Sequence, residues 1–199
     1  DPMFFRKPGL PLLMVEMADG SRIPYWNTFY QEIRDTDDYH TRYLGQMDLN
    51  IKSEKVWDFY RETIKKLAGY GAKIIRLDAF AYAPKAPGRA NFLNEPETWE
   101  FLEQIHKLAK PYGIRLLPEI HAGYKEKKYE LIAQKGYLTY DFFLPGLILD
   151  ALYRGDGTYL EQWAKEQIKE NIHTVNMLGC HDGIPVLDLA GLLPDDRIE

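Results

Sequence analysis

Apolar and polar positions alternate in the rhythm of helices and strands along most of the chain after residue 53. Apolar side chains recur three and four residues apart from Ser53 to Gly71, which predicts an amphipathic helix with Ser53 as its N-cap. A nearly continuous apolar run at 72–80 then predicts a buried strand. The same reasoning predicts further helices and strands at 95–110, 114–120, 125–135, 137–144, 145–170 and 173–179.

Helix and strand therefore alternate four times with short connections, which is typical of parallel βαβ units and predicts an α/β fold. A doubly wound open sheet and a (β/α)8 barrel both fit this rhythm. No G-x-G-x-x-G pattern follows any of the predicted strands, which removes the main support for a dinucleotide-binding sheet.

The first 50 residues follow a different pattern, with prolines at 2, 8, 11 and 24 and many aromatic side chains. Two short strands, 12–17 and 22–26, are predicted around a turn at 18–21. We therefore expect residues 1–50 to form a small separate region and 51–199 to form the α/β part.

Composition narrows the function classes. The 199 residues are 45% hydrophobic and 28% charged, as in an ordinary globular domain, and the net charge of −5 without a basic stripe gives no support for a nucleic-acid partner. The longest apolar stretch, 142–149, is too short to span a bilayer, so we expect no membrane partner. The single cysteine excludes an internal disulfide and fits a reducing cytoplasm. No metal and no organic cofactor is expected.

Two charged side chains interrupt the apolar run at 74–80. Arg76 and Asp78 are two positions apart, so in a strand they point to the same face. Burying both charges is costly unless they are paired or needed for function. Taken alone, the pair is most simply explained as a structural ion pair.

Acidic residues also stand at the ends of other predicted strands, with Glu119 after the second and Asp182 after the fourth. In a parallel barrel such positions meet at one mouth, where active sites lie. Two carboxylates facing one pocket suit glycoside chemistry with retention, in which they lie about 5 to 5.5 Å apart. An adjacent Arg76 would keep Asp78 ionised, and burial would keep Glu119 protonated.

The ordered segments IIRLDAFAY (74–82), LLPEIH (116–121) and LGCHDGI (178–184) resemble the conserved segments of glycoside hydrolase family 13, the α-amylase superfamily. The similarity is closest to its sucrose phosphorylase subgroup, which the stretches WNTF (26–29), QMDLN (46–50) and YDFFLP (140–145) also resemble. The resemblance implies part of a (β/α)8 TIM barrel, the region of strands four to seven, preceded by part of an inserted small domain.

The same resemblance assigns roles to matching positions. Asp78 would be the nucleophile, Glu119 the general acid/base, and Asp182 the stabiliser of the transition state. Arg76 would hold Asp78 in place and ionised, and His181 would bind the glucose. The remaining candidates for substrate contacts are Gln46 in the sugar site, Tyr82 at its edge, and His121 for phosphate or the acceptor.

The implied reaction transfers glucose from sucrose to inorganic phosphate through a glucosyl-aspartate, giving α-glucose 1-phosphate and fructose. Phosphate must then outcompete water, which requires positive groups near the acceptor. Arg6 and Lys7 are candidates, and a solvated loop explains them equally well. The resemblance also makes a homodimer possible.

Several alternatives remain open at this point. The stretch 30–50 is longer than expected for a sucrose phosphorylase, so the donor is sucrose or a relative such as sucrose 6′-phosphate, glucosylglycerol or glucosylglycerate. An amylase-type hydrolase or transglycosylase uses the same carboxylates, and a non-catalytic amylase-like scaffold is the third interpretation. Because the resemblance leaves out the first three strands and the last strand of the barrel, we expect the 199-residue chain alone to be inactive.

Overall fold

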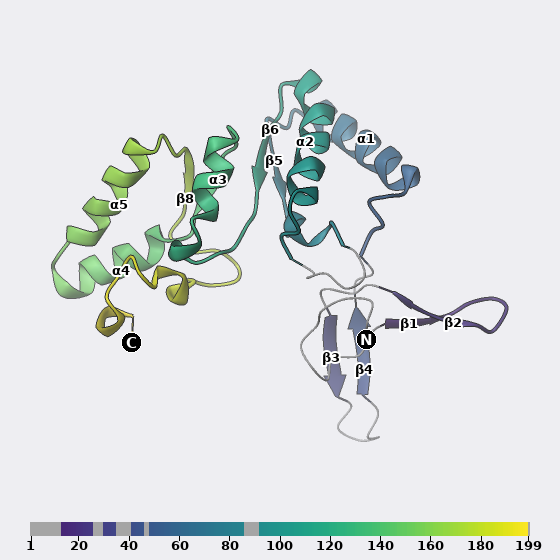
Figure 1. Ribbon diagram of the computed structural model, residues 1–199, viewed down its shortest axis with the longest axis horizontal. Helices are drawn as coiled ribbons and strands as arrows, with labels where there is room; N and C mark the ends of the chain where they lie inside the picture. Colours follow the sequence, from purple (N-terminus) through teal and green to yellow (C-terminus); the bar gives the residue numbers. More distant parts are fainter. Residues whose placement is uncertain (1–12, 26–29, 35–40, 46–47, 86–91, 199) are drawn as a thin grey trace. The chain divides into compact units, whose positions relative to one another are not determined.

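The computed structural model describes residues 13–25, 30–34, 41–45, 48–85 and 92–198, and these divide into two compact units. The first unit holds residues 1–63 and 81–104, and the second holds 64–80 and 105–199. Helix and strand alternate after residue 53, as the sequence predicted (Figure 1). Among the described residues no helix is both long and apolar enough to cross a bilayer.

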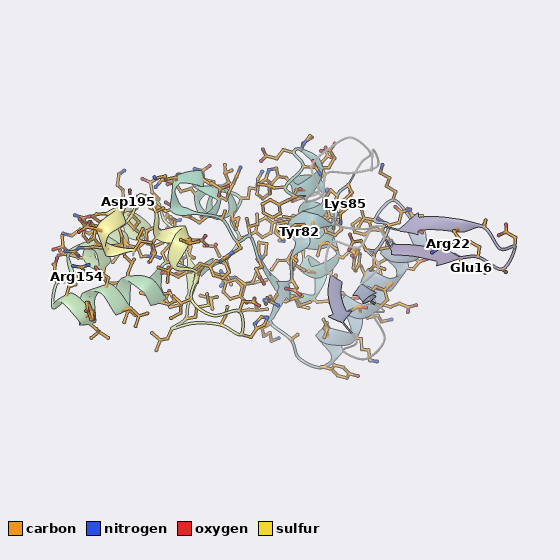
Figure 2. All side chains as sticks on the ribbon, turned by 90° about the horizontal axis from the view of Figure 1, so that it is seen from below. Glu16, Arg22, Tyr82, Lys85, Arg154 and Asp195 are labelled. Carbon is orange, nitrogen blue, oxygen red and sulfur yellow. The ribbon has the colours of Figure 1, made fainter. Side chains whose placement is uncertain are left out.

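The first unit contains two antiparallel hairpins. Strand β1 (Leu13–Glu16) pairs with β2 (Arg22–Tyr25), and β3 (Tyr30–Arg34) pairs with β4 (Thr41–Gly45). The predicted turn at 18–21 closes the first hairpin. Glu16 and Arg22 are register partners beside this turn, and both are exposed (Figure 2).

Two helices follow the hairpins in the chain and are shared between the units. Helix α1 (Glu54–Gly69) begins directly after Ser53, and α2 (Glu97–Ala109) begins after a proline. Within the first unit, the ring of Trp57 packs edge-on against Phe101, with centroids 5.7 Å apart. Amphipathic spacing buries Ile64 of α1 and Phe101 of α2, whereas Phe59, an apolar position of the predicted first helix, is 56% exposed.

The second unit is built on parallel strands. Strand β5 (Ile74–Leu77) pairs with β6 (Arg115–Pro118), and β7 (Thr139–Asp141) pairs with β8 (Thr174–Asn176). Strands β6 and β7 touch without a shared ladder. The chain is therefore a mixed α/β structure with parallel strands, in which the four strands form two separate pairs across the described residues.

One expectation for β5 was wrong. The apolar run predicted a buried strand, yet Ile74 is 48% exposed and Arg76 is exposed as well. The physical reason is pairing: within the described part of the chain, β5 has a ladder with β6 only, which leaves its other edge without a neighbour.

The main core of the second unit lies among α3 (Lys128–Gln134), α4 (Leu144–Arg154) and α5 (Thr158–Lys169) (Figure 1). At its centre, the Trp163 indole donates to the buried carboxylate of Asp141 at 3.0 Å. A short 3-10 helix, η4 (Val186–Leu189), adds Leu189 to this core. A Cβ on Gly146 would lie 2.3 Å from Leu189 Cδ1, so α4 and η4 approach each other at a position without a side chain.

Candidate active site

The predicted pair of charges stands at the end of β5. Arg76 lies in the strand and Asp78 directly follows it, and their side chains form an ion pair of 3.0 Å between Nη2 and Oδ1. The Asp78 side chain is 73% exposed, so one carboxylate stands open at the strand end. The next residue, Ala79, has a φ of 45°, which turns the chain sharply away at the cost of some backbone strain.

Glu119 joins the same cluster from the neighbouring strand. Leu77 and Pro118 are register partners, so Asp78 and Glu119 are the first residues beyond two paired strands. The Glu119 amide donates to the Leu77 carbonyl at 3.1 Å, which fixes the backbone at this point. The Glu119 carboxylate contacts the Arg76 guanidinium, so a single arginine bridges both carboxylates.

Glu119 is far less exposed than Asp78, at 16% of its side chain. Burial raises the pKa of Glu119, Arg76 acts in the opposite direction, and the negative charges of Asp78 and Asp182 raise it further. The raised pKa shows that burial and the two acidic neighbours outweigh the arginine. Glu119 is thus a carboxyl group that keeps its proton to a higher pH than an ordinary glutamate.

Asp182 and His181 lie in a tight turn that begins at Cys180, beyond the end of β8. A backbone hydrogen bond from Gly183 to the Cys180 carbonyl, 3.0 Å long, closes this turn. The His181 Nε2 and Asp182 Oδ2 atoms are 3.4 Å apart, and both side chains are more than 70% exposed. Because the charge of Asp182 acts on the pKa of Glu119, the turn belongs to the same electrostatic site.

His121 follows Glu119 by two residues and is held by a partner that sequence reasoning missed. Its Nε2 lies 2.9 Å from Oδ2 of Asp188 in η4, and its ring meets Phe142 edge-on at 4.7 Å. The hydrogen bond to Asp188 raises the pKa of His121 against the effect of burial, and the charges of Glu119 and Asp182 add to the rise. Nothing in the spacing of His121 and Asp188 signals this contact.

Tyr140 is a second residue that sequence reasoning did not select. The Arg76 guanidinium lies 6.0 Å from the centroid of its ring. Burial raises the pKa of the Tyr140 hydroxyl, Arg76 lowers it, and the charge of Glu119 raises it. Its place in β7, one of the predicted strands, and in the YDFFLP stretch was the available signal.

Of the remaining predicted site residues, one lies in the first unit and three fall outside the described residues. Tyr82 ends the short 3-10 helix η1 (Phe80–Tyr82) in the first unit, where its ring packs on Phe92 at 4.7 Å (Figure 2). Gln46, Arg6 and Lys7 fall outside the described residues, so their roles stay predictions.

One group of side chains has the donor types of a metal site. The ligand atoms of Cys180, His181 and Asp182 all lie within 4.8 Å of one another, and all three residues are exposed. Exposed donors on one turn commonly come together without an ion, so we assign no metal to them.

The chemistry available at the strand ends is that of two carboxyl groups. Asp78 is exposed, Glu119 keeps its proton to a higher pH, and the Arg76 guanidinium contacts both.

Comparison with known proteins shows which proteins this chain resembles. No family model matches the chain. Over its whole length it is 54% identical to a sucrose 6(F)-phosphate phosphorylase of Ilumatobacter coccineus and 37% identical to a sucrose phosphorylase of Streptococcus mutans, covering 39% and 37% of those proteins. The crystal structure of sucrose 6F-phosphate phosphorylase from Thermoanaerobacter thermosaccharolyticum superposes with a TM-score of 0.76 at 34% identity, over 99% of this chain and 37% of that one.

The matched relatives are therefore much longer than this chain, which spans between a third and two fifths of their length. The resemblance seen in the motifs extends over the whole chain and into its three-dimensional structure. The chain is homologous to the sucrose and sucrose 6F-phosphate phosphorylases of glycoside hydrolase family 13.

Proposed function

We propose that this chain carries the acidic residues of a retaining glucoside phosphorylase, within part of a (β/α)8 barrel. The observation that carries the proposal is the cluster at the ends of β5 and β6, where Arg76 contacts both Asp78 and Glu119. Retaining glycoside chemistry needs a nucleophile and a proton donor side by side on neighbouring elements. The raised pKa of Glu119 supports its use as the proton donor.

In the proposed reaction, an oxygen of Asp78 attacks the anomeric carbon of the donor and forms a glucosyl ester. The C1–O bond to the leaving sugar breaks, and Glu119 gives its proton to the departing oxygen. Hydrogen phosphate then attacks the same carbon and gives its proton to Glu119, Asp78 leaves with its electron pair, and α-glucose 1-phosphate forms with retained configuration. Asp182 would hydrogen-bond to the sugar hydroxyls in the transition state, and His181 would bind the glucose.

The donor is the finer part of the proposal. Sucrose is the donor that the motifs suggest, and sucrose 6′-phosphate is a second candidate. The 54% identity to a sucrose 6(F)-phosphate phosphorylase favours the second, and the long stretch 30–50 counts against sucrose without choosing among its relatives. A dianionic leaving group would need additional cations, for which Arg6 and Lys7 remain predictions outside the described residues.

The test is a phosphorolysis screen of a complete enzyme that carries this chain. Sucrose, sucrose 6′-phosphate, glucosylglycerol and glucosylglycerate are each supplied with phosphate, and glucose 1-phosphate is measured. Phosphate-dependent release from one of the first two donors supports the proposal. Free glucose formed at the same rate with and without phosphate would instead identify a hydrolase. We expect the 199-residue chain alone to give no glucose 1-phosphate.

A further inference from the structure

Asp188 has no role in the reaction as described so far, and its contact His121 is a candidate for binding phosphate or the acceptor. We propose that Asp188 is a positioning residue: it orients His121 and fixes a positive charge beside Glu119, where the acceptor phosphate binds. This inference rests on the proposed function. It assigns a role to Asp188, a residue that neither touches the reacting carboxylates nor belongs to the catalytic motifs.

The chain segments that carry the two partners pack against each other. Asp188 is 18% exposed and precedes Leu189, a buried residue of the core of the second unit. The loop after Glu119 lies against the same segment: a Cβ on Gly123 would be 3.9 Å from the Asp188 carbonyl oxygen, in ordinary contact. A Cβ on Gly191 would collide with Lys125, at 2.5 Å from its Cε. The loop that carries His121 is thus packed onto the segment that carries Asp188.

The close contact with Asp188 also selects the nitrogen of His121 that a ligand can use. Nε2 of His121 is engaged by Asp188 at 2.9 Å, and the edge contact with Phe142 fixes the plane of the ring. Within the described part of the chain, no partner is found for Nδ1 of His121. A histidine held at one nitrogen by a carboxylate presents the other N–H in a defined direction.

The charges around His121 explain why a phosphate would need it. The acidic groups that face it are Asp188 from η4, Glu119 from the end of β6 and Asp182 from the turn after β8, while Phe142 is uncharged. Arg76 is already shared by two carboxylates. A phosphate dianion approaching this site meets mainly negative charge, and an imidazolium offsets it.

The experiment compares Asp188→Asn with the wild type in a complete enzyme that carries this chain, with exposed Asp195→Asn as the matched control (Figure 2). We expect Asp188→Asn to raise the KM for phosphate about 10-fold, the usual loss on weakening one charge-assisted hydrogen bond, and to change phosphate-independent hydrolysis of the donor less than 3-fold. Asp188→Glu should restore much of the phosphate affinity, and thermal melting checks that each variant is folded.

Two further measurements separate positioning from a merely structural role. In the wild type, the KM for phosphate should rise as the pH passes the pKa of His121, and this inflection should move to lower pH in Asp188→Asn. In a His121→Gln background, Asp188→Asn should have no further effect on the KM for phosphate, because its partner is gone.

A folded Asp188→Asn enzyme with an unchanged KM for phosphate and an unchanged inflection would overturn the inference, as would an equal effect of Asp195→Asn. Titration of the His121 ring protons by NMR tests the pair without any turnover. If the wild type phosphorolyses no donor, the proposed function fails and the role of the pair in phosphate binding fails with it. If phosphorolysis occurs and the titration is the same in both enzymes, only the role of Asp188 fails.

Discussion

Two glutamates in the second unit, Glu119 and Glu166, are buried to a similar extent beside a cation, and their pKa values are shifted in opposite directions. Their side chains are 16% and 22% exposed. Glu119 contacts Arg76 and has a raised pKa. Burial also acts to raise the pKa of Glu166, but hydrogen bonds from Lys127, Tyr124 and Tyr129 lower it.

The difference lies in how completely each carboxylate is bonded. Glu166 accepts hydrogen bonds of 2.6 to 2.8 Å from the Tyr124 hydroxyl, the Lys127 ammonium and the Tyr129 hydroxyl. Lys127 also lies 3.8 Å from the centroid of the Tyr124 ring. Glu119 shares the Arg76 cation with Asp78 and faces the negative charges of both Asp78 and Asp182. A carboxylate that accepts several hydrogen bonds is stabilised in its charged form and has a structural role. A carboxylate with few donors keeps its proton to a higher pH and remains available for reaction.

The largest effect is expected from Asp78→Asn in a complete enzyme that carries this chain. An amide cannot act as the attacking carboxylate, so glucose 1-phosphate formation should fall about 10⁴-fold or more. Thermal melting should change little, because Asp78 is exposed. Turnover near the wild-type rate would remove Asp78 from the role of nucleophile.

Glu119→Gln should reduce phosphorolysis of the natural donor about 10² to 10⁴-fold, since the leaving oxygen then departs without a proton. A donor with a good leaving group, such as α-glucosyl fluoride, needs no protonation, so formation of the glucosyl-enzyme from it should be much less affected. Pre-steady-state release of fluoride measures this step. Equal losses with both donors would mean that Glu119 is not the acid.

The matching substitution, Glu166→Gln, should leave the chemistry intact and affect stability instead. Loss of the charged acceptor for Lys127 and two tyrosines should lower the free energy of unfolding by about 1 to 3 kcal/mol. Chemical denaturation of Glu166→Gln and Glu119→Gln side by side tests the contrast. A greater loss in Glu119→Gln would reverse our assignment of the two clusters.

The smallest effect is the pH dependence of stability. Because the pKa of Glu166 is lowered in the folded state, its ionised carboxylate stabilises the folded protein. This stabilisation is complete above the unfolded pKa of about 4.3 and is lost as the pH falls through the folded pKa. The raised pKa of Glu119 has the opposite effect on stability. Its stabilisation of the folded protein is complete below the unfolded pKa of about 4.3 and is lost as the pH rises through the folded pKa.

Melting temperatures of the wild type and both glutamine variants across pH 3 to 8 measure these contributions. The gap between the wild type and Glu166→Gln should narrow toward pH 3, and the wild type should lose stability relative to Glu119→Gln as the pH rises. Parallel curves for all three proteins would show that neither carboxylate is shifted as described.

The pattern of apolar and polar residues along the chain was enough to predict the order of helices and strands and the ion pair between residues two positions apart. Periodicity placed the helices within a few residues, and spacing of two along a strand predicted the ion pair between Arg76 and Asp78, which the structure confirms. The bridge from Arg76 to Glu119 depends on the parallel register of β5 and β6. Sequence order suggested that the strand ends meet, without showing that they share one cation.

Contacts between residues far apart in sequence escaped prediction. Lys127 lies at the start of a predicted helix and binds Glu166, 39 residues away, a contact that the sequence pattern did not predict. Asp188 likewise meets His121 only because two loops pack together. Burial of β5 was overestimated for a similar reason. The apolar pattern of a strand indicates that the strand can be buried, but it does not show which elements among the described residues cover it.

The close approach at Gly146 has a consequence for engineering donor preference. Leu189 fills the space where a side chain at 146 would stand, and it is covalently next to Asp188. Even an alanine at 146 would require the Leu189 side chain, next to Asp188 in the chain, to move, although position 146 itself is remote in sequence from every acidic residue of the site. A mutant library built to change the sugar specificity should therefore keep glycine at this position.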